Sequence, residues 1–200
     1  MTHHGNAHPP RPEDRNRGHE GAEPSPDPTG QTRCFASTAG IPPSPDRDAQ
    51  VWITAARDPT IAALLESIYS DAAAEVARRG PACWASGRCC NFEQAGHRLY
   101  TTGLETAYTV IHINASNPSL SAKALAESLS RGGCPFQVNN LCGVHAIKPL
   151  SCRLYFCDRS AQTWQHELSE RLLERLKRLH DTHQVPYRYA EWRQLLSLFC

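Results

Sequence analysis

The sequence has little that would take the protein into a membrane or onto a nucleic acid. No apolar run is long enough to cross a bilayer, and the N-terminal residues lack the apolar core of an export signal, because they read MTHHGNAHPPRPEDRN. Lys and Arg total 21 while Asp and Glu total 20, so there is no basic field to hold a phosphate backbone. We therefore expect a cytoplasmic protein with no membrane partner and no nucleic-acid partner; a protein partner is left open.

Cysteine, in contrast, is abundant. The chain has 9 cysteines in 200 residues, and most of them fall into one block at 83–90 and a second block at 134–157. Cytosolic thiols are kept reduced, so such a pattern more often indicates metal or redox chemistry than a disulfide framework. The odd total also argues against complete pairing. Two remote groups of thiols are what a soft metal needs and what an ordinary core does not.

Composition divides the chain near residue 48. Residues 1–48 are rich in Pro, Gly, Ser, His and charge, and they cannot bury enough apolar surface to offset the entropy of ordering. We predict a disordered Pro/His-rich tail over 1–48 and a helical cysteine-cluster domain over 49–200, with its cysteine blocks at 83–90 and 134–157. A chain of this length suits one domain with a genuine core.

Apolar residues recur at three- and four-residue spacing in several segments, which indicates helices. They are expected from Pro59 to about Arg79, from Gly103 to about Ile111, from about Ser119 to about Arg131, from Trp164 to Leu179, and around Trp192. The expected fold is mainly α, a small helical domain built around a cysteine-rich metal site. An antiparallel pair formed by the two helices between the blocks would bring Cys134 back beside Cys90.

Seven cysteines are candidate metal ligands. They are Cys83, Cys89, Cys90, Cys134, Cys142, Cys152 and Cys157. Their spacings match neither the two-residue knuckle of zinc ribbons nor the ferredoxin runs, so the pattern predicts an iron–sulfur cluster or zinc without selecting one. Seven thiols exceed the four that a zinc ion or a cubane cluster takes, which leaves a second site, structural cysteines and redox work open. Cys89 and Cys90 are adjacent, and we expect their side chains to diverge.

Basic residues and one histidine accompany the cysteines in sequence. Arg88, Lys148 and Arg153 are placed to moderate the negative charge of clustered thiolates. His145 lies three residues after Cys142 and is a candidate ligand for a zinc site of three cysteines and one histidine.

The two blocks read CWASGRCC and, after a helical insert, CPFQ…C…KPLSCRLYFC. This order of motifs resembles a bacterial cysteine-cluster family labelled YkgJ-like, with the signature CxxCxxCC, which is described as a zinc- or iron-chelating domain. The resemblance implies that the remaining cysteines bind metal, although Ser86 stands where the family has its second cysteine and is a poor substitute for a thiolate. The positions that match are Cys83, Cys89, Cys90, Cys134, Pro135, Cys142, Cys152 and Arg153.

The leading hypothesis is a metal-binding protein with a redox or metal-handling role. Two hypotheses in which the protein is an enzyme compete with it. Flagellin lysine N-methylases resemble the same cysteine block, which makes a protein methyltransferase the alternative function. The sequence shows no glycine motif that would hold a phosphate or a methyl donor. A thiol nucleophile paired with His97 or His145 is the third hypothesis. Whether the protein is an enzyme therefore stays open.

Overall fold

The structure is a computed structural model that describes residues 47–83 and 85–200. Within these residues the chain is mainly helical, which confirms the expected fold class. The tail predicted over 1–48 lies outside the described residues except for Arg47 and Asp48, which belong to the first helix. None of the helices described is both long and apolar enough to span a bilayer.

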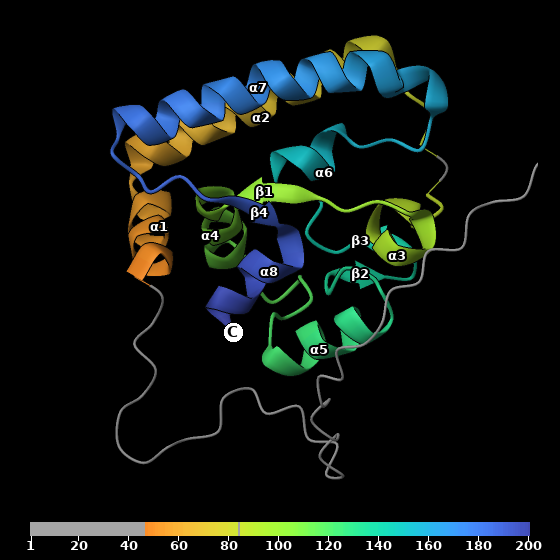
Figure 1. Ribbon diagram of the computed structural model, residues 1–200, viewed down its shortest axis with the longest axis horizontal. Coiled ribbons are helices and arrows are strands. Elements are labelled where there is room, and N and C mark those ends of the chain that lie inside the picture. Colours follow the sequence, from red (N-terminus) through yellow and green to blue (C-terminus); the bar gives the residue numbers. More distant parts are fainter. Residues whose placement is uncertain (1–46, 84) are drawn as a thin grey trace, which may run out of the picture. The chain divides into compact units, whose positions relative to one another are not determined.

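Long helices frame a set of short elements. The α-helices of the described residues are α1 (Arg47–Arg57), α2 (Pro59–Arg79), α3 (Phe92–Ala95), α4 (Gly103–Ile111), α5 (Ala122–Ser130), α6 (Leu150–Leu154), α7 (Gln162–Thr182) and α8 (Trp192–Leu196). Two antiparallel ladders pair β1 (Tyr100–Thr102) with β4 (Tyr189–Glu191) and β2 (Gln137–Val138) with β3 (Leu141–Cys142). Short 3-10 turns cover Arg88–Cys90, Arg159–Ala161 and Ser197–Phe199. The cysteine blocks lie in the short elements that connect α2 to α7 (Figure 1).

Helix α2 begins and ends where the sequence predicts. The Asp58 carboxylate accepts hydrogen bonds from the backbone N–H groups of Thr60 (2.8 Å) and Ile61 (3.2 Å). Gly80 ends the helix in the left-handed conformation, with φ of 57°. Helix α7 lies along α2 (Figure 1), and their apolar faces join α1, α4 and α6 in a first hydrophobic core.

The prediction that the two insert helices pair with each other is wrong. Helix α4 packs against α1 and α8, and α5 packs against α8. The start of α4 lies so close to α1 that a Cβ on Gly103 would be 2.2 Å from the ring of Trp52. Helix α8 comes from the far end of the chain, and its apolar side chains cover both helices in place of a direct pairing.

The short strands are the elements that helical periodicity does not reveal. Strands β2 and β3 form a hairpin whose turn residues Asn139 and Asn140 have φ of 49° and 65°, a conformation that Asn tolerates better than most residues. The hairpin sets Cys142 opposite Gln137. The tight turn therefore fixes the backbone position of Cys142, which is one of the predicted metal ligands.

Glu105 is a buried carboxylate at the start of α4 that joins several elements. It accepts hydrogen bonds from the hydroxyl groups of Tyr69, Thr101 and Thr102 and from the backbone N–H groups of Thr102 and Leu150, at 2.8 to 3.4 Å. Leu150 begins α6, the helix that carries one of the predicted ligands. The same carboxylate therefore completes the capping box of α4 and anchors α6.

Replacement of Glu105 by alanine should destabilise the fold severely. Glu105→Ala leaves buried donors without an acceptor, so we expect the free energy of unfolding to fall by about 3 kcal/mol or more. Urea denaturation followed by circular dichroism measures the change. Glu127→Ala is the control, since that exposed carboxylate has Lys123, 3.9 Å away, as its ion-pair partner among the described residues, and its loss should cost less than about 0.5 kcal/mol. Equal losses for the two variants would contradict the anchoring role.

Candidate metal centre

The two cysteine blocks are hydrogen-bonded to each other. The N–H of Cys134 donates to the carbonyl of Cys90 at 2.8 Å, and the side-chain amide of Gln137 donates to the carbonyl of Gly87 at 3.0 Å. Gly87 has φ of 72°, and a Cβ on it would lie 2.6 Å from the Gln137 amide and 2.8 Å from the Asn140 side chain. The first block is therefore seated against the β2–β3 hairpin at a distance that only glycine permits.

Four cysteines pack together at this contact. Cys90 and Cys134 belong to one hydrophobic cluster, and Cys89 and Cys142 pack against it. We call these four cysteines the inner group, and each block supplies two of them. The expected divergence of Cys89 and Cys90 stays a prediction; in the 3-10 turn Arg88–Cys90, Cys90 is buried and Cys89 is half-buried.

The neighbouring thiols give the inner group different acidities. The Cys90 thiol lowers the pKa of Cys89 to about 6 and that of Cys142 to about 7, with a further contribution from the Lys148 cation. It also lowers the pKa of Cys134. The thiols of Cys134, Cys142 and Cys89 in turn raise the pKa of Cys90. The thiolate, which is the form that binds metal, is therefore favoured at the three partners and disfavoured at Cys90.

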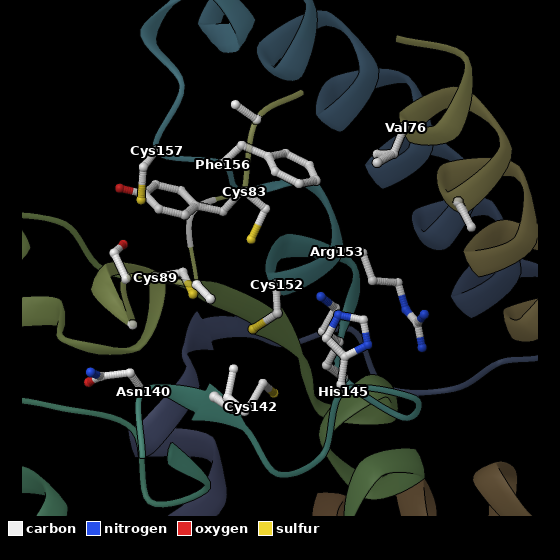
Figure 2. Close-up of a pocket in the computed structure, with 18 of the residues that line it drawn as sticks. Val76, Cys83, Cys89, Asn140, Cys142, His145, Cys152, Arg153, Phe156 and Cys157 are labelled. Carbon is white, nitrogen blue, oxygen red and sulfur yellow. The ribbon is translucent and has the colours of Figure 1, made fainter. Parts of the chain in front are cut away.

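The other three predicted ligands lie around a cavity of about 460 Å³. These outer cysteines, Cys83, Cys152 and Cys157, line the cavity together with Cys89 and Cys142 of the inner group. Figure 2 shows the sulfur atoms of Cys83, Cys89 and Cys152 pointing into it. Burial, followed by the charges of neighbouring thiols, raises the pKa of Cys152. The seven predicted ligands are therefore gathered in one region, four in and around the second hydrophobic cluster and three more around the cavity.

Separate contacts position the outer cysteines. The backbone N–H of Ala82 donates to the Asp158 carboxylate at 3.4 Å, which holds the segment before Cys83 beside the segment after Cys157. Cys152 lies in α6, the helix whose first N–H is bound by the buried carboxylate of α4.

Three residues beside the site have roles that the sequence did not reveal. The ring of His97 stacks on Tyr155 with centroids 4.2 Å apart, and its Nε2 lies 3.4 Å from the carbonyl oxygen of Cys89. Trp192 Nε1 is buried without a hydrogen-bond partner of ordinary geometry in the part of the chain described, yet the indole lowers the pKa of the Cys134 thiol. Trp192 belongs to α8, so no local spacing relates it to either block.

Ser86 and His145 lie at the cavity and not in the inner group. The Oγ of Ser86 accepts a hydrogen bond from the N–H of Arg88 at 3.5 Å. His145 is exposed and lies near two cations. The charge of Lys148, followed by partial burial and the charge of Arg153, lowers the pKa of its imidazole. The imidazole of His97 contacts the backbone carbonyl of Cys89. Among the described contacts it has no hydrogen bond to a cysteine thiol, which a thiol nucleophile paired with His97 would need.

As they stand, the described residues hold no group of three or more His, Cys, Asp or Glu side chains placed to bind a metal ion. The inner cysteines pack together, and an ion bound among them would replace those contacts. The donor set fits a soft metal, since it consists of clustered sulfurs with a nearby ammonium and an indole N–H to moderate their charge. Metal binding is therefore a proposal that rests on the chemistry of these side chains.

Comparison of the chain with protein-family models, with curated proteins and with solved structures finds no match. The resemblance to the YkgJ-like family therefore stays a prediction. What the site does is argued below from the residues of this chain.

Gly87→Ala should separate the two blocks. Gly87 and Gly96 both have a left-handed backbone, with φ of 72° and 68°, so alanine costs about 1 kcal/mol for the backbone conformation at either position. Nothing lies within 4 Å of a Cβ on Gly96, whereas one on Gly87 meets the hairpin. We expect Gly87→Ala to lower the free energy of unfolding by at least about 1 kcal/mol more than Gly96→Ala and to increase the number of thiols that react rapidly with a disulfide reagent. Equal effects on stability and reactivity would contradict the tight seating.

Proposed function

We propose that the protein binds a metal through its clustered cysteines, as a zinc ion or an iron–sulfur cluster, and that the centre has a redox or metal-handling role in the cytoplasm. The observation that carries this proposal is the gathering of cysteines from both blocks, with Cys90 and Cys134 in one cluster, Cys89, Cys142 and Cys152 packed against it, and Cys83 and Cys157 in the lining of the adjoining cavity. Buried thiolates lose solvation and repel one another unless a cation compensates them. A metal would supply that cation and join two remote segments, so its binding would contribute to folding.

A single ion suits the inner group. In a tetrahedral site with zinc–sulfur bonds of about 2.3 Å, neighbouring sulfurs lie about 3.8 Å apart, which is close to the separation of two thiols in contact. The turn Arg88–Cys90 supplies two of these sulfurs, and the segment from Cys134 to Cys142 supplies the other two. Zinc bound there would leave the outer cysteines free to face the cavity.

An iron–sulfur cluster would take a different ligand set. A cubane core is larger than one ion, and the cavity lined by the outer cysteines with Cys89 and Cys142 is where the structure has room for it. Cys90 and Cys134 do not line that cavity. The two metals therefore predict different dependences on individual cysteines.

Anaerobic purification, elemental analysis and a visible absorption spectrum test the proposal. A zinc centre predicts a colourless protein with about one zinc per chain, and Cys90→Ser or Cys134→Ser should lower its zinc content at least about tenfold. A cluster predicts a brown protein that contains iron and sulfide and depends on Cys83 and Cys152. Cys200→Ser is the control, because Cys200 is in neither the inner group nor the cavity lining. A folded protein purified with neither metal would contradict the proposal.

Trp192→Phe should weaken metal binding. The change removes the indole N–H that lowers the pKa of Cys134, and loss of such a supporting contact typically costs about tenfold in metal affinity. Competition with a chelator measures the affinity. Trp52→Phe is the matched control, since it removes an indole N–H that donates to the Pro186 carbonyl at 2.7 Å in the first core and should leave metal affinity unchanged. Equal affinities in the two variants would show that the indole does not act on Cys134.

A further inference from the structure

The cavity beside the inner group is bounded by apolar side chains as well as by sulfur. Its volume of about 460 Å³ lies within the range of sites that hold small organic molecules. Ala73, Val76 and Ala77 of α2 line one wall, and Phe156 lies nearby in the lining (Figure 2). None of the described Asp or Glu residues lines this cavity.

Three basic side chains complete the lining. His145, Lys148 and Arg153 all face the cavity, and Figure 2 shows His145 and Arg153 side by side. Both cations are close enough to His145 to lower its pKa. Within residues 47–83 and 85–200, no carboxylate forms an ion pair with Lys148 or Arg153. Lys148 acts on the thiols of Cys89 and Cys142 in the same lining, so the positive charge on this side that has no described group of opposite charge is that of Arg153.

Arg153 is held in place and keeps hydrogen-bonding capacity. Its guanidinium lies over the ring of Tyr69, 4.2 Å from the centroid, and one of its nitrogens donates to the Ala146 carbonyl at 2.7 Å. Its Nε is buried and has no partner among the residues described. A guanidinium has five N–H donors, so donors remain for a ligand on a side chain that is already oriented.

The position of Lys148 at the cavity is explained by its effect on the negative charge of the thiolates. The position of Arg153 is not explained in this way. Lys148 acts on the thiols, because it lowers the pKa of Cys89 and Cys142. The described interactions of the Arg153 side chain are with Tyr69, Tyr108, Ala146 and His145, and none of these carries a negative charge that would balance it.

We propose that the cavity binds a small organic anion, with its negative group on Arg153 beside His145 and its apolar body against Val76, Ala77 and Phe156. The carboxylate, sulfonate and phosphate monoester share the required chemistry, because each offers oxygen acceptors that a guanidinium binds in pairs. The inference goes beyond the metal centre, since it depends on side chains that the inner group does not use.

Two fluorescent dyes with the same apolar body test the requirement for charge. Anilinonaphthalene sulfonate carries an anionic group and phenylnaphthylamine does not. With the full chain as purified, and its metal content measured on the same sample, we expect saturable binding of one anionic dye per chain. The neutral dye should bind at least about tenfold weaker, and benzoate should displace the anionic dye.

A pair of glutamate substitutions on α2 locates the site. Ala77→Glu adds a carboxylate at an exposed position that lines the cavity, and Ala74→Glu adds one at an exposed position that lines a different surface. We expect Ala77→Glu to weaken the anionic dye at least about tenfold more than it weakens the neutral dye, while Ala74→Glu changes neither. Arg153→Met should act as Ala77→Glu does; if it fails to fold, the glutamate pair decides.

The outcomes separate this inference from the metal proposal. Equal binding of the two dyes, or equal effects of the two glutamates, would overturn the anion site. So would the absence of dye binding in protein that carries zinc, or in protein without metal, since in neither does a cluster fill the cavity. If the folded protein is purified without metal and still binds the dye, the anion site is supported and only the metal proposal is contradicted.

Discussion

The hydrogen bond from the Cys134 N–H to the Cys90 carbonyl, at 2.8 Å, joins two segments that are separated along the chain by α3, α4 and α5, and the geometry of the cysteine site depends on it. Its neighbours extend the contact, because the N–H of Glu93 donates to the carbonyl of Gly132 at 3.0 Å and a Cβ on Gly133 would lie 3.2 Å from the Cys90 carbonyl. A hydrogen bond contributes about 1 kcal/mol net. Backbone pairing alone therefore cannot hold several like-charged thiolates together, and the surrounding core or a bound cation has to supply the rest.

The surrounding core has two parts that meet at α8. One contains the faces of α1, α2, α4, α6 and α7, and the other contains Cys90 and Cys134 packed with Phe92, Phe136 and Trp192. Helix α8 serves both, because Leu195 belongs to the first part and Leu196 to the second. Glu105 gives a second connection through its bond to α6. The cysteine site is therefore built on a helical frame that contains none of the inner thiols, and a metal would stabilise the second part more than the first.

Features set by adjacent residues could be predicted from the sequence. The caps at Asp58 and at Thr102 with Glu105 formed as expected, because a cap depends on a few consecutive residues. The gathering of the seven cysteines also followed, since their chemistry is evident without coordinates. The placement of Trp192 against Cys134 could not be predicted, because it depends on α8 folding back over both blocks. Nor could the 3-10 turn that holds Cys89 and Cys90, which a sequence of two adjacent cysteines does not specify.

The division of the seven thiols favours metal handling over a purely structural centre. A structural zinc site is closed, and all of its ligands are used to hold the fold. Here Cys89 and Cys142 belong to the inner group and also line the cavity, where they adjoin Cys83, Cys152 and Cys157. Sulfur donors therefore continue from the exposed Cys83 to the buried Cys90. A thiolate exchanges a soft metal readily with a neighbouring thiolate, so a graded set of donors offers a route by which an ion could enter or leave, which a closed four-cysteine site lacks.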